Sequence, residues 1–177
     1  MSFSEVLSVE NKTQDQKFTI FCVGAIIQRE INGVLCILLQ ERYKGEDSPE
    51  SGLIEVPCGK VKVCSSAYDV IRQKVYKETG LTITRIFGEE RAYQRLMNGY
   101  RVLEYFPFCS AQNLEGNYSI SMDFFICEAK GEHLDHTSES LNIRWVPIHT
   151  IREMLMNRQE KFYPMVIGAL QKFCDAN

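Results

Sequence analysis

The chain has 177 residues, of which 45% are hydrophobic and 24% are charged, and its net charge is −3. These values are typical of one soluble globular domain that is long enough to bury a core. The small negative charge gives no general attraction to nucleic acid or to an anionic membrane, so any anion-binding site has to be local. No apolar run approaches the ~18 residues of a membrane span, and the seven cysteines include no CxxC pair. We therefore expect a cytoplasmic protein with reduced thiols.

The N-terminal segment, residues 1–17, is polar, and we expect it to form an arm that precedes a single domain over residues 18–177. Two runs rich in β-branched and aromatic residues open that domain, at residues 18–28 and 34–41. The dipeptide Asn32-Gly33 lies between them and is a strong hairpin signal, so the two runs are expected to pair antiparallel.

The remaining elements are predicted from turn residues and apolar patterns. Further strands are expected at residues 53–56, 81–87, 100–109, 124–129 and 142–146, with polar loops at 42–52 and 110–119. A first helix is expected between a cap at Ser66 and a stop at Gly80. A short helix is expected to begin at a capping box of Thr150 and Glu153, and a last helix at Pro164. This order of elements predicts an α/β (α+β) fold, in which helices cover both faces of a mixed β-sheet.

The first predicted helix carries a carboxylate on its apolar face. On a helical wheel Val70, Ile71 and Val75 form one stripe, and Glu78 lies within it. A carboxylate that faces the core near a helix C-terminus is disfavoured by desolvation and by the helix dipole. Either a metal, a cation or backbone N–H groups compensate Glu78, or its side chain reaches solvent at a frayed helix end. The wheel does not decide between these alternatives.

The stretch around this helix resembles the box of the Nudix hydrolases, G-x5-E-x7-R-E-U-x-E-E-x-G-U, in which U is aliphatic. With the box glycine at Gly59, consensus positions are matched by Val75, Glu78, Gly80 and Leu81. Segments outside the box are also similar to the family: LLQER at 38–42, IEVPCGKV at 54–61, RWVPI at 144–148 and YP at 163–164. The resemblance spans roughly residues 18–174 and implies a Nudix-type α/β/α sandwich with a mixed β-sheet.

The box departs from the family pattern at the positions that bind metal. In the family, the box glutamates bind Mg²⁺ or Mn²⁺, which holds a diphosphate and activates water. The consensus glutamates and arginine are replaced here by Ser65, Gln73, Lys74 and Lys77, and only Glu78 remains. A dication about 4 Å from one ammonium group is repelled by roughly 8 kcal/mol at an effective dielectric constant of ~20. We therefore expect ordinary metal binding to be lost unless other residues supply ligands.

The lysines suggest a different way to hold a phosphate. Lys60 and Lys62 lie on the loop before the helix, and with Lys74 and Lys77 they form a basic group around Gly59. Ammonium groups bind phosphate as point charges, so these residues are candidate phosphate-binding residues. Solvated surface lysines are the competing explanation. Arg42 and Glu55, which lie in the segments before the box, are candidate substrate-binding residues.

An active enzyme would need carboxylates from outside the box. Glu139 lies in the loop where many Nudix enzymes place an extra metal-binding or general-base glutamate, so Glu78 and Glu139 are the candidate catalytic residues. The resemblance implies Glu78 and the backbone carbonyl of Cys58 as metal ligands. A nearby HLDH segment, residues 133–136, resembles a metal cluster but is equally well explained as a polar surface loop.

We predict a Nudix-fold protein that binds a nucleoside diphosphate-linked small molecule, with weak or absent hydrolysis and no cofactor. One alternative is an active diphosphatase that depends on Mg²⁺ or Mn²⁺. Another is a non-catalytic scaffold or oligomer subunit that contacts a partner through residues 89–118. The expected partner is a small nucleotide-like ligand, and we expect no binding to nucleic acid or membrane. A homodimer is a further possibility.

Overall fold

The computed structural model describes residues 18–116 and 118–177, so the predicted N-terminal arm lies outside the described residues. The strands are β1 (Ile20–Ile31), β2 (Val34–Arg42), β3 (Ile54–Glu55), β4 (Cys58–Lys60), β5 (Thr82–Ile86), β6 (Tyr93–Met97), β7 (Tyr100–Glu104), β8 (Cys109–Gln112), β9 (Ile120–Lys130) and β10 (Ser140–Pro147). The helices are α2 (Ala67–Thr79), α3 (Ile148–Asn157) and α4 (Pro164–Ala176), and 3₁₀ turns lie at Glu89–Arg91 and Gln159–Lys161.

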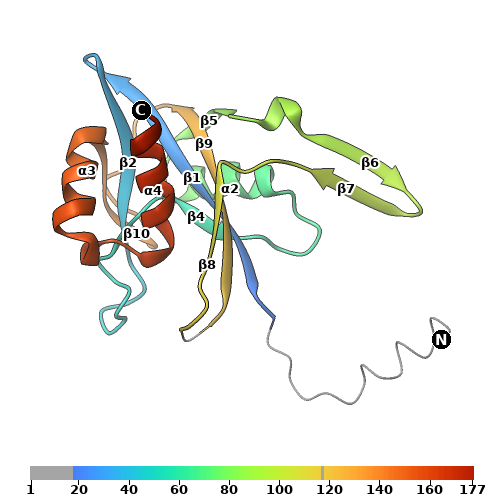
Figure 1. Cartoon of the computed structure of the whole chain (residues 1–177), viewed down its shortest axis with the longest axis horizontal. Helices are drawn as coiled ribbons and strands as arrows, with labels where there is room; N and C mark the ends of the chain where they lie inside the picture. Colours follow the sequence, from blue (N-terminus) through green and yellow to red (C-terminus); the bar gives the residue numbers. More distant parts are fainter. Residues whose placement is uncertain (1–17, 117) are drawn as a thin grey trace.

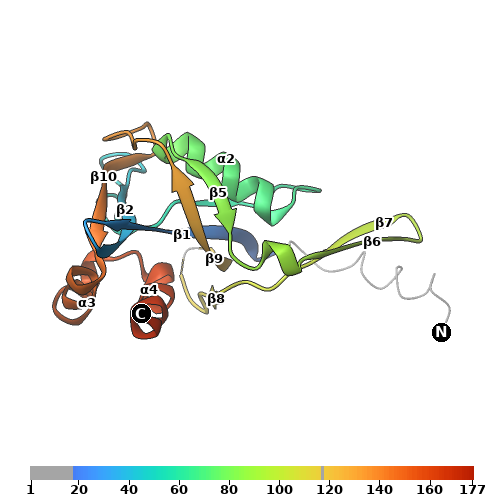
Figure 2. The same ribbon diagram turned by 90° about the horizontal axis from the view of Figure 1, so that it is seen from above.

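Eight of these strands form one mixed sheet (Figure 1). Its main order is β10-β2-β1-β9-β5, while β3 pairs with β2, β4 with β1 and β8 with β9. Strands β1 and β9 are parallel, and the other pairs are antiparallel. Helix α2 covers one face of the sheet, and α3 and α4 cover the other (Figure 2). The predicted fold class, with helices on both faces of a mixed sheet, is confirmed.

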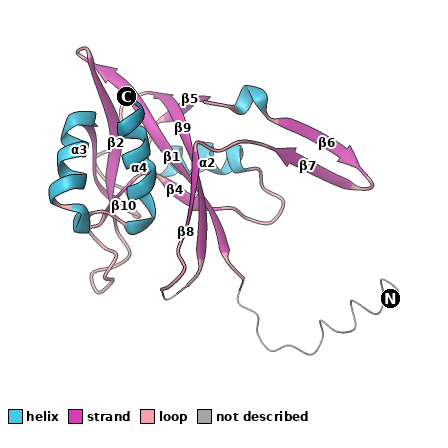
Figure 3. Cartoon of the chain, in the orientation of Figure 1, coloured by secondary structure: helices cyan, strands magenta, loops and turns pink. Residues whose placement is uncertain are grey.

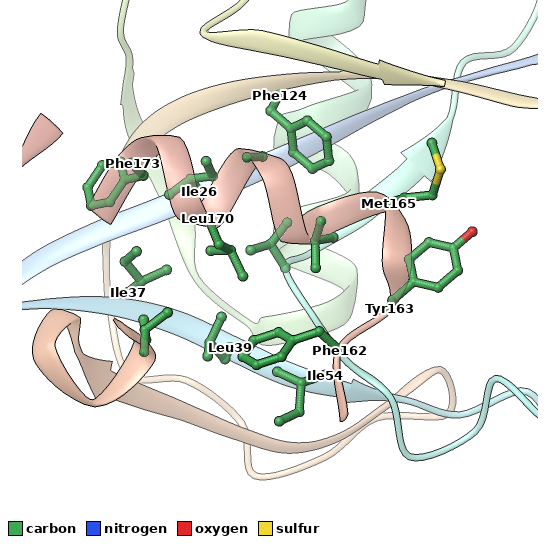
Figure 4. Packing of buried hydrophobic residues seen from close by; sticks show 14 of the residues in the cluster. Ile26, Ile37, Leu39, Ile54, Phe124, Phe162, Tyr163, Met165, Leu170 and Phe173 are labelled. Carbon is green, nitrogen blue, oxygen red and sulfur yellow. The ribbon is translucent and has the colours of Figure 1, made fainter. Parts of the chain in front are cut away.

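The two faces of the sheet bury two separate cores. The core under α3 and α4 includes Ile26, Ile37, Leu39, Phe124, Phe162, Leu170 and Phe173 (Figure 4). The core under α2 includes Ala25, Ile27, Leu38, Ile71, Val75 and Phe125. Neighbouring residues such as Leu38 and Leu39 serve opposite cores because successive side chains of a strand point to opposite faces.

Turn and cap residues set the element ends as predicted. Asn32 and Gly33 adopt positive φ angles of 51° and 77°, and β1 and β2 pair antiparallel around them. Ser66 accepts a hydrogen bond from the N–H of Asp69 at 3.2 Å and so caps helix α2. Gly80 ends that helix in the left-handed conformation, with φ of 77°. These features confirm the predicted first hairpin and the predicted bounds of the helix.

Two predicted elements are corrected by the structure. The predicted strand at 100–109 is two strands, β7 and β8, because Tyr105 turns into the core under α2 and Pro107, which lacks an N–H, follows it. The predicted loop at 110–119 therefore begins within β8. Helix α3 begins at Ile148, without a side-chain cap from Thr150. Ile148 is buried in the core under α3 and α4, so the helix starts directly after Pro147.

The hairpin of β6 and β7, here called the 93–104 hairpin, forms a separate two-stranded sheet that projects from the body of the molecule (Figure 3). Its turn is Asn98-Gly99, with φ angles of 52° and 80°. This hairpin was not predicted from the sequence, although its turn has the same dipeptide that predicted the β1–β2 hairpin.

The seven cysteines are all free thiols, in agreement with the predicted absence of a disulfide framework. Four of them, Cys22, Cys36, Cys127 and Cys174, are buried, and Cys64 is exposed. Among the described helices, none combines the length and apolar character needed to cross a membrane.

Candidate functional site

The predicted site lies where helix α2 packs across β4. In β4, Gly59 pairs with Val23 of β1, and the side chain of Lys74 crosses directly over Gly59. A Cβ atom on Gly59 would lie only 2.8 Å from Cδ and 2.9 Å from Cε of Lys74. A glycine at position 59 therefore allows the aliphatic stem of Lys74 to lie flat against the strand.

Glu78 is buried, with 4% of its surface exposed. One of its oxygens, Oε1, lies 2.8 Å from Nζ of Lys74, one helical turn earlier. The other oxygen, Oε2, accepts a hydrogen bond of 2.9 Å from Nε2 of Gln40 on β2. The negative charge of Glu78 is therefore balanced by the ammonium group of Lys74 and by the amide of Gln40. The alternative prediction, that the Glu78 side chain reaches solvent, is wrong.

Lys74 also contacts a second carboxylate from a distant part of the chain. Its Nζ atom lies 2.8 Å from Oε2 of Glu139, and Lys77 pairs with the other oxygen of Glu139. Hydrogen bonds from Lys74 and then from Lys77 lower the pKa of Glu139 to about 2. Burial disfavours the charged form of Lys74, but Glu78 and Glu139 outweigh it and raise the pKa of Lys74 above its ordinary value. The ammonium group of Lys74 is thus a fixed positive charge between two carboxylates.

A second ion pair lies beside the first. Arg42 is buried and pairs with Glu55, and its Nη2 atom lies 2.9 Å from Oε2 of Glu50. Its guanidinium group stacks 3.9 Å from the centre of the Tyr163 ring. Burial raises the pKa of Glu55, and the attraction of Arg42 opposes that shift. Arg42 and Glu55 therefore stabilise each other inside the protein.

Gln40 connects the two ion pairs. Its Nε2 atom lies 2.9 Å from Glu78 and 3.4 Å from Oε1 of Glu55, so one amide bridges two buried carboxylates. Its Oε1 atom is buried without a hydrogen-bond partner among the described residues. The result is one ion network with a buried centre, which consists of Glu50, Arg42, Glu55, Gln40, Glu78, Lys74, Glu139 and Lys77.

Sequence reasoning missed the roles of Gln40, Glu50 and Tyr163. A signal for Gln40 was present, because it lies two residues after Leu38 and therefore on the strand face that packs against α2. A polar residue on that face, opposite a buried Glu78, indicates a hydrogen bond between them. Glu50 lies in a polar loop and Tyr163 before the last helix, and no local pattern connects either of them with Arg42.

The other candidate residues lie at the edge of the network. Lys60 and Lys62 are exposed, and the described part of the chain provides no ion-pair partner for either. The thiol of Cys58 lies 3.6 Å from Oε2 of Glu55, and burial raises its pKa well above the ordinary value, so the thiol is neutral. Within residues 18–116 and 118–177, no three His, Cys, Asp or Glu side chains are grouped to hold a metal ion, including those of the 133–136 segment.

The carboxylates of the network do not fit a divalent cation as they are placed. Both oxygens of Glu78 and both oxygens of Glu139 already accept from a lysine or an amide. Nζ of Lys74 lies 2.8 Å from each carboxylate, in the position that a bridging cation would need. A divalent cation about 4 Å from this ammonium group would be repelled by roughly 8 kcal/mol. The lysine and a metal ion therefore exclude each other.

The chain matches a family model described as NUDIX domain over residues 20–166. A MutT protein from Methanosarcina mazei is 20% identical with a TM-score of 0.59, over 93% of this chain and 99% of that one. The NUDIX domain of Shewanella oneidensis NrtR, solved with ADP ribose, is 16% identical with a TM-score of 0.58, over 86% of this chain and 88% of that one. An Ap4A hydrolase from C. elegans is 13% identical with a TM-score of 0.51, over 88% and 95% of the two chains. Among curated proteins, none matches the chain.

Proposed function

Because the chain belongs to the NUDIX family, we propose that it binds a nucleoside diphosphate-linked small molecule, and that its hydrolysis of such a ligand is weak or absent. One observation carries the proposal: Nζ of Lys74 lies 2.8 Å from both Glu78 and Glu139. The family generally uses a divalent metal ion held by glutamates of the box. Here a lysine from the box supplies the positive charge instead, so the ligand is expected to bind without metal.

Exposed positive charge supports the choice of a phosphate-containing ligand. Lys60 and Lys62 are exposed at the start of the box loop, and the side chain of Lys77 is 60% exposed at its other side. Lysines bind phosphates as point charges. Because the net charge of the whole chain is −3, the positive charge of these lysines is a local feature of the site. The structural similarity to the NrtR domain solved with ADP ribose makes ADP-ribose a suitable first ligand to test.

Glu139 has a specific part in this proposal. Its two oxygens pair with the ammonium groups of Lys74 and Lys77, which we propose to be the groups that bind the diphosphate. We therefore expect the ligand to displace Glu139, which acts as an internal competitor. Glu139→Gln is expected to raise the affinity for ADP-ribose about tenfold, which corresponds to about 1.4 kcal/mol. Glu132→Gln, an exposed position in the same connection, is the matched control and is expected to change nothing.

Isothermal titration calorimetry with ADP-ribose in EDTA tests the proposal. We expect a submillimolar dissociation constant, weakened at least fivefold by Lys60→Glu and by Lys62→Glu. Lys130→Glu, which removes an exposed lysine at the far end of β9, is the control for net charge. Absence of binding at millimolar ADP-ribose would contradict the proposal, as would equal effects of all three variants.

Arg42 and Glu55 were predicted to contact the substrate, and that role stays a prediction. Their side chains are only 8% and 5% exposed, and they form an ion pair with each other. A ligand would have to open the ion network to reach them. We therefore propose that Arg42 and Glu55 act indirectly: they hold Gln40 in place, and Gln40 in turn holds Glu78.

The second candidate function is an active Nudix diphosphatase. It is favoured by the convergence of three carboxylates, since Gln40 joins Glu55 to Glu78 and Lys74 joins Glu78 to Glu139. A hydrolysis screen with nucleotide sugars, dinucleotides and nucleoside triphosphates, in Mg²⁺ and in Mn²⁺, separates the two functions. Turnover that Glu78→Gln abolishes would establish the enzyme, and absence of turnover together with ligand binding would support the proposal.

A further inference from the structure

The 93–104 hairpin is firmly attached at its base. Just after the hairpin, the ring of Tyr105 packs 5.7 Å from Phe125 and 6.0 Å from Tyr68, in the core under α2. The hydroxyl of Tyr105 donates a hydrogen bond of 3.2 Å to Asp123 of β9. Just before the hairpin, Glu89 pairs with Arg72 of α2. Contacts on both sides therefore fix the direction in which the hairpin leaves the body.

Beyond its base, one face of the hairpin is apolar and unsupported. The strand register places six side chains on this outer face: Tyr93, Arg95, Met97, Tyr100, Val102 and Glu104. Its apolar members are all exposed, from 44% for Val102 to 73% for Tyr100. Leu103 lies on the opposite face and packs against the core under α2, so the outer face is the side turned away from that core.

Such a face is unfavourable for an isolated chain. A two-stranded hairpin is at best marginally stable in water, and contiguous exposed apolar groups mark interaction sites. In the described part of the chain, β6 and β7 pair only with each other. The projecting position seen in Figures 1 and 2 leaves this face accessible to another molecule.

The charges of the hairpin restrict the kind of partner. The outer face contains one arginine and one glutamate, so its net charge is zero. A neutral surface gives no attraction to nucleic acid or to an anionic membrane. On the outer face, Arg95 lies 3.4 Å from Glu104, so the face offers one charge of each sign among its apolar side chains. A second copy of the same face is therefore complementary to it in both polarity and charge.

We propose that two copies of this chain associate through the outer face of the 93–104 hairpin. A two-fold interface brings the same patch of both subunits together, and it requires a patch that is complementary to itself. The exposed tyrosines and Met97 form the apolar centre of this interface, where aromatic residues and methionine are enriched in general. Arg95 and Glu104 pair with the opposite charges of the second copy.

The mass of the full chain in solution tests this proposal. Multi-angle light scattering or sedimentation is expected to show a species of twice the 20.4 kDa chain mass at micromolar concentration. Tyr100→Glu is expected to weaken the dimer at least tenfold. Leu96→Glu is the matched control, because Leu96 is 74% exposed on the other face of the same hairpin, and it is expected to leave the dimer unchanged. A monomeric wild type, or equal loss in both variants, would overturn the proposal.

A charge-reversal mixture tests whether the partner is the same face. Arg95→Glu leaves two acidic groups on the outer face, and Glu104→Arg leaves two basic groups. Each variant alone is expected to dimerise more weakly than the wild type, and an equimolar mixture is expected to recover the dimer. No recovery in the mixture would contradict an interface in which the outer face meets its own copy.

Discussion

The ion network and the 93–104 hairpin differ in which side chains they bury and which they expose. In the network, the charged groups of Arg42, Glu55 and Glu78 lie inside the protein, and each carboxylate has a cationic partner from the same chain. In the hairpin, apolar groups lie outside, and the described residues leave them uncovered. The network is complete within one chain, so its variants should change stability and ligand affinity. The proposed role of the hairpin needs a second chain, so its variants should change association.

The largest effect is expected from Lys74→Met, which keeps a long apolar stem but removes the ammonium group. The variant leaves Glu78 buried without its cation, and the loss of one partner of a buried ion pair costs about 3 kcal/mol or more. Urea unfolding followed by circular dichroism measures this loss. Lys77→Met is the control, since that side chain is 60% exposed and its ion pair should contribute less than about 1 kcal/mol. Equal losses in the two variants would show that Lys74 has no special place in the network.

The next effect concerns metal ions. Lys74→Glu combined with Lys77→Glu returns carboxylates to two positions of the box, which lie four residues and one residue before Glu78. Positions 74, 77 and 78 are spaced i, i+3 and i+4, so they share one helix edge. This double variant is expected to gain Mn²⁺ binding, and a hundredfold excess of Mn²⁺ over the dissociation constant would stabilise it by about 2.7 kcal/mol. Thermal unfolding with and without Mn²⁺ provides the measurement. An equal stabilisation of the wild type would contradict the exclusion of metal by Lys74.

A smaller effect is expected at the base of the hairpin. Tyr105→Phe keeps the ring packing against Phe125 but removes the hydrogen bond to Asp123, which is worth about 1 kcal/mol. Hydrogen exchange in residues 93–104 should become faster, while the ion network stays unaffected. If exchange there is unchanged, the hairpin is not held through Tyr105.

The smallest effect is a dependence of stability on pH. The lysines lower the pKa of Glu139 to about 2 in the folded protein, from an ordinary value of 4.5. A lowered pKa gives stability that is present above pH 4.5 and is lost as the pH falls toward 2. Because Glu139 is partly exposed, the contribution should stay below about 1 kcal/mol. The difference in unfolding free energy between wild type and Glu139→Gln should shrink over this pH range, and a constant difference would argue against the ion pairs.

Much of the fold was predictable because its signals are local. The Asn32-Gly33 turn, the Ser66 cap and the left-handed Gly80 each act within a few residues, and the structure confirms all three. The same Asn-Gly signal at 98–99 was missed, because the neighbouring strands carry exposed apolar side chains and do not show the usual alternation. The start of α3 was wrong because burial of Ile148 is a tertiary effect that the sequence pattern near Thr150 does not reveal.

The site was predictable only in part, for a related reason. The helical wheel placed Glu78 on the core side, and the box spacing placed Lys74 and Lys77 beside it. The pairing of both lysines with Glu139, 65 and 62 residues away, depends on the approach of a distant loop. The stacking of the Arg42 guanidinium group on the Tyr163 ring likewise joins residues that lie far apart in the chain. Sequence periodicity carries no information about such long-range charge pairing.

We propose that the ammonium group of Lys74 occupies the cation position of the box. Paramagnetic broadening of backbone amide signals by Mn²⁺, recorded by nuclear magnetic resonance on the wild-type protein, tests it most directly. We expect micromolar Mn²⁺ to leave the signals of Gly59, Lys74 and Glu78 as sharp as those of the distant helix α4. In the double variant Lys74→Glu with Lys77→Glu, we expect the signals of this site to broaden. Selective broadening of these signals in the wild type would contradict the claim.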